Sequence, residues 1–315
     1  MIKIEKSSAP RVVIGKHLTS LIEKNNKIIV IDNDLGTSTS SADVEKTFPK
    51  NFLELGIGEQ SSLSAATGLA LEGMFPVYVN FAIFASGTIW TQIRQAAYAK
   101  ANLKIIATHP GLDAGPDGAS HQATQDMALM RCIPNMNVIL PLDENDVKSA
   151  ISYALNNKGL YYVRVAREPV PIIYNSPEEA NFDIKNKELY STGDDVAIFF
   201  DGSSFEQAIA SVNLLEENNI KYRLIHVRSL KPLDADDIIE CAKKVKCVIT
   251  LENHSVIGGL GSAVAEVLSA HKDVAPLRIV GCKDSFTESG KSTELKLKYG
   301  VSAQNVFEKV KEVLK

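Results

Sequence analysis

The first segment with residue types suited to chemistry is Gly56-Ile57-Gly58-Glu59-Gln60, in which Glu59 opens a run of small and apolar residues that favours a helix. A carboxylate in the first turn of a helix is stabilised by the helix dipole. A semi-buried carboxyl at the same place would have a raised pKa and could share a proton with a ligand. The spacing alone leaves both interpretations open.

The second segment carries two phenylalanines, Phe81 and Phe84, three residues apart and directly after an expected strand. Ligands of open parallel sheets bind outside the carboxyl ends of the strands. Aromatic rings at such a place can hold a flat heterocycle by offset stacking. Filling of the hydrophobic core is the more common role of phenylalanine, and it is favoured on these two residues alone.

The third segment, residues 108–122, is a glycine-rich loop with two histidines, His109 and His121, and two aspartates, Asp113 and Asp117. A loop so rich in glycine and short polar residues buries little, so its histidines are not needed for a core. Long loops in compact domains are often functional. We therefore expect this loop to be part of a site.

The three segments must be positioned by the secondary structure around them. Along the chain, short apolar runs rich in β-branched residues alternate with amphipathic stretches. The runs predict strands at 27–32, 76–80, 104–108, 137–140, 161–165, 196–200, 222–227, 247–251 and 277–280. The stretches predict helices at 12–24, 60–72, 87–99, 122–131, 144–156, 205–218, 236–244, 259–270 and 303–315. This alternation predicts an α/β fold with mainly parallel sheets and helices on both faces.

A polar stretch from Tyr174 to Asp194 interrupts the alternation, lacks apolar periodicity and is typical of a linker. We expect two α/β domains, residues 1–175 and 193–315, joined by a linker at 176–192. Each domain should contain its own mainly parallel sheet.

Composition and charge exclude several classes of protein. The 34 basic and 38 acidic residues give a net charge of −4, without the basic excess of a nucleic-acid-binding protein. No apolar run approaches the roughly 18 residues of a membrane span, and the charged N-terminus lacks the apolar core of a secretion signal. The four cysteines form no C-x-x-C pair, so we expect neither disulfides nor zinc and a cytoplasmic location.

Two glycine motifs are weak signals. Gly290-Lys291-Ser292 lacks the first glycine of a phosphate-binding loop, because residue 285 is serine. The run Gly258-Gly259-Leu260-Gly261 begins seven residues after the expected strand end at Leu251, too late for a dinucleotide fingerprint. We interpret the second motif as tight packing between a strand and a helix.

Taken in order, the segments resemble transketolase, and specifically its C-terminal half as it occurs in split, two-subunit transketolases. Residues 32–38 resemble the family's Asp-Leu-x-x-Ser segment, residues 56–60 its G-[IV]-x-E-x segment, and residues 115–122 its G-E-D-G-x-T-H-Q loop. Glu252-Asn253-His254, Gly258–Gly261 and Asp284–Gly290 match in the second half. The likeness covers nearly the whole chain and implies a pyrimidine-binding domain followed by a transketolase C-terminal domain.

The resemblance implies thiamine diphosphate as cofactor, with the protein supplying orientation and proton management. Glu59 matches the family glutamate that hydrogen-bonds the pyrimidine ring, a role that requires a protonated carboxyl in a dry pocket. Phe81 and Phe84 match the aromatic residues beside the pyrimidine, and Asp34 is implied as a further cofactor contact. At the position of a third aromatic residue of the family this chain has Gly87, so fewer aromatic rings would surround the pyrimidine.

The resemblance also implies a sugar-binding site for the transfer of a two-carbon ketol unit from a ketose to an aldose. His121 and Asp117 match residues that contact sugar hydroxyls near the reacting carbons. Residues that hold a terminal phosphate fall on Arg11, Ser38, His109 and Arg167, a set suited to a dianion. A sulfonate would use similar donors, so a sulfosugar remains an alternative. The family glutamate before Asp117 is Pro116 here, which removes one carboxylate.

The family holds the diphosphate and its divalent metal, Mg²⁺ or Ca²⁺, with a G-D-G…N motif in the N-terminal half, and no Gly-Asp-Gly occurs in this chain. The resemblance therefore implies that this chain ligates no metal, and that an N-terminal partner subunit completes the site in an α2β2 assembly. One alternative is the β subunit of a 2-oxo acid dehydrogenase E1 component, and deoxyxylulose-phosphate synthase fits less well. A non-catalytic assembly subunit is the alternative from another class. The second domain is expected to serve mainly as assembly surface.

Overall fold

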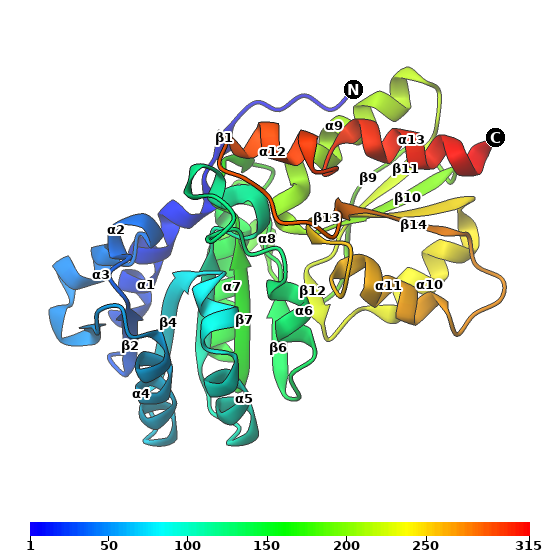
Figure 1. Ribbon diagram of the computed structural model, residues 1–315. Helices are drawn as coiled ribbons and strands as arrows, with labels where there is room; N and C mark the ends of the chain where they lie inside the picture. Colours follow the sequence, from blue (N-terminus) through cyan, green and yellow to red (C-terminus); the bar gives the residue numbers. More distant parts are fainter.

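Two parallel sheets lie side by side in the computed structural model, which describes residues 1–315 (Figure 1). The first sheet has the order β12 (Ser229–Lys231), β6 (Met136–Ile139), β7 (Leu160–Val165), β5 (Lys104–Thr108), β4 (Phe75–Phe81), β2 (Ile28–Asp32) and β3 (Phe52–Glu54). All neighbours are parallel except β12, which pairs antiparallel with β6. The predicted α/β class with parallel sheets is confirmed.

Helices cover both faces of the first sheet, because its central strands are mostly apolar and buried on both sides. One face packs against α4 (Glu59–Leu71), α5 (Trp90–Tyr98) and α6 (Asp126–Arg131). The other face packs against α1 (Ile14–Ile22) and α7 (Glu144–Asn156). Asp143 defines the start of α7, since its side chain accepts hydrogen bonds from the backbone N–H groups of Asn145 and Asp146.

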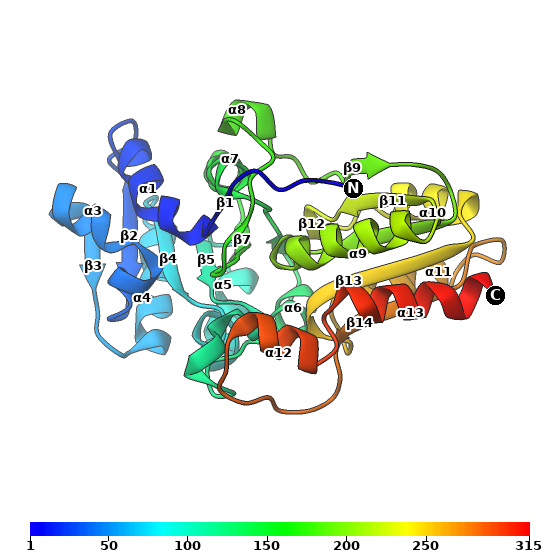
Figure 2. The same cartoon turned by 90° about the horizontal axis from the view of Figure 1, so that it is seen from above.

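The second sheet has the order β14 (Leu277–Cys282), β13 (Cys247–Ser255), β10 (Val196–Phe200), β11 (Tyr222–His226) and β9 (Lys187–Ser191). Only β9 is antiparallel to its neighbour. One face packs against α10 (Ala235–Lys244) and α11 (Leu260–Leu268), and the other against α9 (Phe205–Glu217) and α13 (Ala303–Leu314) (Figure 2). The cluster beneath α4–α6 continues without a break into the α10–α11 face, so the two halves share one core.

Short elements complete the chain. The strands β1 (Ser7–Ser8) and β8 (Val170–Pro171) pair with each other. Four short helices are α2 (Gly36–Thr39), α3 (Ala42–Thr47), α8 (Pro177–Ala180) and α12 (Ser292–Lys298). Single turns are η1 (Pro10–Val13), η2 (Pro49–Asn51), η3 (Phe84–Thr88), η4 (Gly111–Asp117) and η5 (Gly202–Ser204). None of the helices has the length and apolar character that crossing a membrane requires.

Besides the short strands β1, β3 and β8, which were not predicted, the structure differs from the sequence-based expectation at β9, β12 and β13. The segment 176–192, interpreted as a linker, contains α8 and the edge strand β9, whose exposed and partly exposed residues give little apolar signal. The short strand β12 lies in the second half of the chain but joins the first sheet. The strand β13 extends four residues beyond Leu251 to Ser255, because its polar residues are buried rather than exposed.

The glycines after β13 are required for close packing, as expected. A Cβ atom on Gly261 would lie 2.5 Å from Cγ2 of Ile279, and one on Gly259 would lie 2.0 Å from a carboxylate oxygen of Glu252. That carboxylate accepts hydrogen bonds from the backbone N–H groups of Leu260 and Gly261 at the start of α11. These glycines therefore pack a helix against a strand.

A buried ion-pair cluster joins the two halves beside the shared core. The guanidinium of Arg164, on β7, lies 2.8 Å from Asp126 and 2.6 Å from Asp201, and all three side chains are almost fully buried. The remaining donors of Arg164 bond to Oγ of Ser203 and to the backbone carbonyl of Asn253. Because Asp201, Ser203 and Asn253 belong to the second half, Arg164 ties the second sheet to the first.

We expect Arg164→Met to lower the free energy of unfolding by about 3–5 kcal/mol, because two buried carboxylates would lose their counter-ion. Urea unfolding measures the difference. Arg223→Met is the matched control: Arg223 also pairs with two carboxylates, Glu188 and Asp194, but lies at the surface, where such pairs contribute about 0–1 kcal/mol. Equal losses in the two variants would contradict the role given to the buried cluster.

Candidate functional site

The predicted site residues meet at one edge of the first sheet. Most of them lie at or after the carboxyl ends of β2, β4, β5 and β7, which lie together because the four strands are parallel. Glu59 follows the neighbouring parallel strand β3, and Arg11 lies in η1, before α1. This edge is where ligands of open parallel sheets bind. It is the upper end of the first sheet in Figure 1.

Glu59 is the first residue of α4, and its side chain is partly exposed. A buried amide network holds the turn that carries it. Asn33, after β2, donates to the carbonyl of Gly56 at 2.6 Å and to Oγ of Ser62 at 2.8 Å. Asn80, at the end of β4, donates to Oδ1 of Asn33 at 3.4 Å. The ends of two strands thus hold the turn from which Glu59 begins α4.

Two aromatic rings and two imidazoles form one group beside this turn. The rings of Phe81 and His109 stack at 3.7 Å between centroids, and Phe81 and Phe84 lie 6.3 Å apart and nearly parallel. The edge of His121 meets Phe84 at 5.3 Å. Phe81 and His109 are buried, whereas Phe84 and His121 are partly exposed. The exposed members therefore form a surface on which a flat ring could stack.

The four residues predicted to bind an anion also come together. Nη1 of Arg11 donates to the backbone carbonyl of Ser38 at 2.6 Å, which joins α2 to the turn before α1. Burial and the nearby charge of Arg167 lower the pKa of Arg11. The charges of Arg11 and Arg167 both act on His109. The two guanidiniums and the imidazole therefore share one small region.

His109 has an unusual backbone and an unusual charge state. Its φ angle of +59° is in the left-handed region, which non-glycine residues rarely adopt except at functional sites. Burial, together with the charges of Arg11, Arg167 and His121, lowers the pKa of His109 to about 3. Its Nδ1 lies 2.9 Å from Oγ1 of Thr108. His109 is therefore a neutral hydrogen-bonding group at neutral pH.

Two predicted residues lie at the exposed margin. Asp34 has a φ angle of +59° and an exposed side chain, and its backbone N–H donates to Glu54 at 3.0 Å. Asp117 is exposed at the end of η4. No contact joins either carboxylate to the aromatic group or to the arginines within this chain, so their roles stay predictions.

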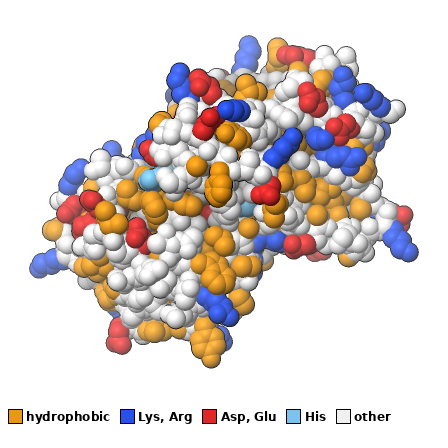
Figure 3. All heavy atoms as spheres, in the orientation of Figure 1, with side chains coloured by type: hydrophobic (Ala, Val, Ile, Leu, Met, Phe, Trp, Pro, Cys, Tyr) orange, Lys and Arg blue, Asp and Glu red, His pale blue; other side chains and the backbone are white.

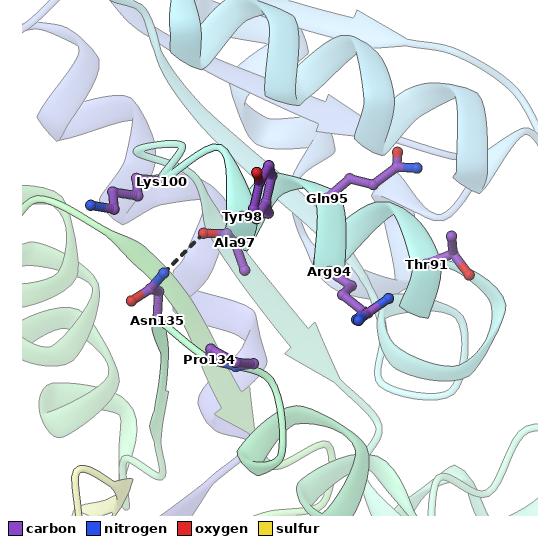
Figure 4. Close-up of a pocket in the computed structure, with 8 residues that line it drawn as sticks. All are labelled: Thr91, Arg94, Gln95, Ala97, Tyr98, Lys100, Pro134 and Asn135. Carbon is purple, nitrogen blue, oxygen red and sulfur yellow. Dashed lines mark hydrogen bonds between the residues drawn. The ribbon is translucent and has the colours of Figure 1, made fainter.

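One cavity is remote from these residues. It has a volume of about 480 Å³ and is lined by residues of α5 and of the loop before β6, including Arg94, Tyr98 and Asn135 (Figure 4). Nδ2 of Asn135 donates to the carbonyl of Ala97 across it. The cavity lies near the amino ends of β5 and β6, so it is separate from the predicted site.

Sequence reasoning missed the buried residues whose hydrogen bonds support the turn before Glu59. Asn33, Asn80 and Tyr78 are fully or almost fully buried, and the Tyr78 hydroxyl accepts a 2.8 Å hydrogen bond from Asn80. Two asparagines directly after or within apolar strands were the available signal, since buried amides need partners. The expected helix at 87–99 also begins late, because a π-type turn, η3, re-aims the chain after Phe84.

Comparison with known proteins identifies both halves. Residues 6–171 match the model described as "Transketolase, pyrimidine binding domain", and residues 186–306 match "Transketolase, C-terminal domain". The chain belongs to the transketolase family. The predicted resemblance and the two-domain α/β fold of this family are thereby confirmed.

Several relatives are similar in length to this chain. A Methanocaldococcus jannaschii protein, "Putative transketolase C-terminal section", is 39% identical over 96% of this chain and 95% of its own. The "6-deoxy-6-sulfo-D-fructose transketolase subunit SqwH" of Clostridium sp. is 33% identical over 94% of this chain and 91% of its own. A solved structure, "Split gene transketolase, inactive beta4 tetramer", is 40% identical, covers 97% of this chain and 98% of its own, and has a TM-score of 0.88.

The pyrimidine-binding domain of transketolase implies thiamine diphosphate as the cofactor. The described residues fit its pyrimidine ring. Glu59 and Phe84 are both partly exposed, so a carboxyl could reach a ring nitrogen and an aromatic ring could stack on its face. A Cβ atom on Gly56 or Gly87 would meet no other atom within 4 Å, so the space beside these two glycines is open.

We expect the imidazole signals of His109 to stay unshifted in NMR spectra from pH 8 to pH 5, whereas an unfolded chain titrates near pH 6.5. Since the folded pKa is the lower one, the unfolded state binds more protons below about pH 6.5, and stability falls as the pH falls toward 3. In His109→Asn, which tolerates the same backbone, stability should decline less between pH 6.5 and 4. Titration of the folded imidazole near pH 6.5 would disprove this.

Proposed function

We propose that the chain is the C-terminal subunit of a thiamine-diphosphate-dependent transketolase that transfers a two-carbon ketol unit from a ketose with an anionic end to an aldose. The observation that carries the proposal is the convergence, at one sheet edge, of Glu59 with the aromatic group and of Arg11, His109 and Arg167. A carboxyl, a stacking surface and an anion site are the three parts that such a reaction needs from this half.

Glu59 would bind the cofactor's pyrimidine ring through a hydrogen bond between its carboxyl and a ring nitrogen. The amide network of Asn33 and Asn80 holds the turn that precedes Glu59. When bound, thiamine diphosphate supplies the carbanion-stabilising chemistry. Phe81 and Phe84 orient the ring, and His121 exchanges hydrogen bonds with a substrate hydroxyl as charge develops.

Arg11 and Arg167 bind the anionic end of the sugar, assisted by the Ser38 hydroxyl and the neutral His109. Guanidinium groups are suited to this task because they form paired, charge-assisted hydrogen bonds to phosphate. Nε of Arg11 and Nε of Arg167 are both buried and lack a partner within the chain, so each has a donor to offer. A sulfonate fits the same donors, and the similarity to a sulfofructose transketolase subunit supports it as the second candidate.

A partner polypeptide supplies the diphosphate side and the metal, Mg²⁺ or Ca²⁺, in an α2β2 assembly. The chain has no Gly-Asp-Gly and no group of three or more side chains suited to a metal ion. Large apolar side chains next to Glu59 are exposed, Ile57 by 82% and Leu55 by 43%, and such patches mark interaction surfaces. Figure 3 shows hydrophobic side chains gathered on one face, beside an imidazole.

The purified chain, given thiamine diphosphate and Mg²⁺, should therefore have no ketol-transferase activity, and an N-terminal subunit with the G-D-G…N motif should restore it. The coupled assay compares the chain, the partner and their mixture. Full activity of the chain alone would refute the partner requirement. Release of CO₂ from a 2-oxo acid by the mixture would instead support the dehydrogenase alternative.

Glu59→Gln should lower turnover of the assembled enzyme by about 10²-fold or more, because it removes a proton-transfer group. The matched control is Glu72→Gln, an exposed residue just after the other end of α4, and it should retain normal turnover. Circular dichroism checks that both variants fold. Near-normal turnover of Glu59→Gln would refute the role of Glu59 and favour a non-catalytic subunit.

A further inference from the structure

Asp113, in the loop after β5, is fully buried and receives donors from both halves of the chain. Its Oδ1 lies 2.9 Å from Nδ2 of Asn253, on β13, and 2.8 Å from Nζ of Lys296, on α12. Its Oδ2 accepts a 3.2 Å hydrogen bond from the backbone N–H of Arg167. One carboxylate thus connects two buried residues of the second half to a predicted substrate residue.

Asn253 holds the same loop at two more points. Its Oδ1 accepts from the backbone N–H of Leu112 at 2.9 Å, and its Nδ2 lies 3.2 Å from the carbonyl of Pro110. Gly111, between them, has a φ angle of +54°, and a Cβ there would lie 2.1 Å from the carbonyl oxygen of Asn253. The main chain of β13 is therefore pressed directly against the loop, two residues after His109.

The connection reaches the anion site through Arg167. Besides its backbone bond to Asp113, Arg167 donates from Nη1 to the carbonyl of Asp113 at 3.2 Å. The guanidinium also forms an ion pair with its neighbour Glu168. Because the backbone and the side chain of Arg167 are both held by Asp113, a shift of Asp113 would move the guanidinium.

The far end of the loop is held by the same domain. Nε2 of Gln122 donates to the carbonyls of Gly115 and Glu288, each at 3.1 Å. Gly118 lies so close to Ser289 that a Cβ would meet its Oγ at 2.6 Å. The segment from Pro110 to Gln122, which includes Asp117 and His121, is therefore fixed at both ends by the second domain.

We propose that Asn253 and Lys296 are positioning residues through which the second domain sets the enzyme's specificity for the anionic end of its substrate. This inference rests on the substrate assignment of the proposed function. The two residues touch no substrate. They fix Asp113, which fixes Arg167 and the chain after His109. The second domain is on this account a part of substrate recognition rather than assembly surface alone.

The test uses the assembled enzyme with its partner subunit and compares a ketose phosphate with the same ketose lacking phosphate. Lys296→Met and Asn253→Ala should each lower kcat/KM for the phosphorylated donor by about 10-fold, mainly through KM, because a charge-assisted contact is worth about that factor. For the donor without phosphate, kcat/KM should change less than about two-fold on the same scale. The inhibition constant of inorganic phosphate should rise in parallel.

Lys104→Met is the matched control, because Lys104 is also a buried lysine with three hydrogen-bond partners but lies at the opposite end of the sheet. It should lower thermal stability and leave the ratio of the two kcat/KM values unchanged. KM and inhibition constants do not depend on the amount of folded enzyme, so a poorly folding variant still gives an answer, and Lys296→Gln is a milder second substitution.

The outcomes distinguish failure of the positioning role from failure of the proposed function. If the wild-type enzyme prefers the phosphorylated donor but Lys296→Met and Asn253→Ala keep that preference, the positioning role is refuted while the proposed function stands. If the wild-type enzyme transfers ketol units without any preference for an anionic end, both the substrate assignment and this inference are refuted. The inference is supported if Lys296→Met and Asn253→Ala lose the preference for the phosphorylated donor while Lys104→Met keeps it.

Discussion

The buried guanidinium of Arg164 is the contact on which the rest of the arrangement depends. It lies between Asp126 of the first half and Asp201 of the second, and both carboxylates are removed from water. Such a cluster is stable only while every member keeps its partners. The cluster therefore fixes the two sheets relative to each other. The loop from Pro110 to Gln122, which lies between them, can then form contacts with both halves.

The site takes its properties from this fixed frame. The turn that carries Glu59 depends on asparagines at the ends of two strands, and Arg167 bonds to a carboxylate, Asp113, that also bonds across the domain boundary. His109 remains neutral because it is buried beside two arginines. Arg167 thus owes its position, and His109 its charge state, to residues from other parts of the chain.

The sequence alone was sufficient to predict the strands and helices that have a clear pattern of apolar residues. The strand at 104–108 and the helix at 144–156 agree with the structure to the residue, because the first is a buried run and the second an amphipathic helix with a capping Asp143 at its start. The edge strand β9 and the end of β13 were missed, since the first is half exposed and the second is polar yet buried. The convergence of Arg11 and Arg167, 156 positions apart, came from the resemblance, and the bonds of Asp113 could come only from coordinates.

The strand β12 has a consequence for how such a chain can be divided. It comes from the second half, yet it covers the outer edge of the first sheet beside β6. A gene break between the two sheets would leave β6 with an open row of backbone donors and acceptors, a surface that invites aggregation. A pyrimidine-binding domain of this type would therefore need another protection for the edge at β6 once separated from its neighbour, such as a replacement strand, charged side chains or a covering helix.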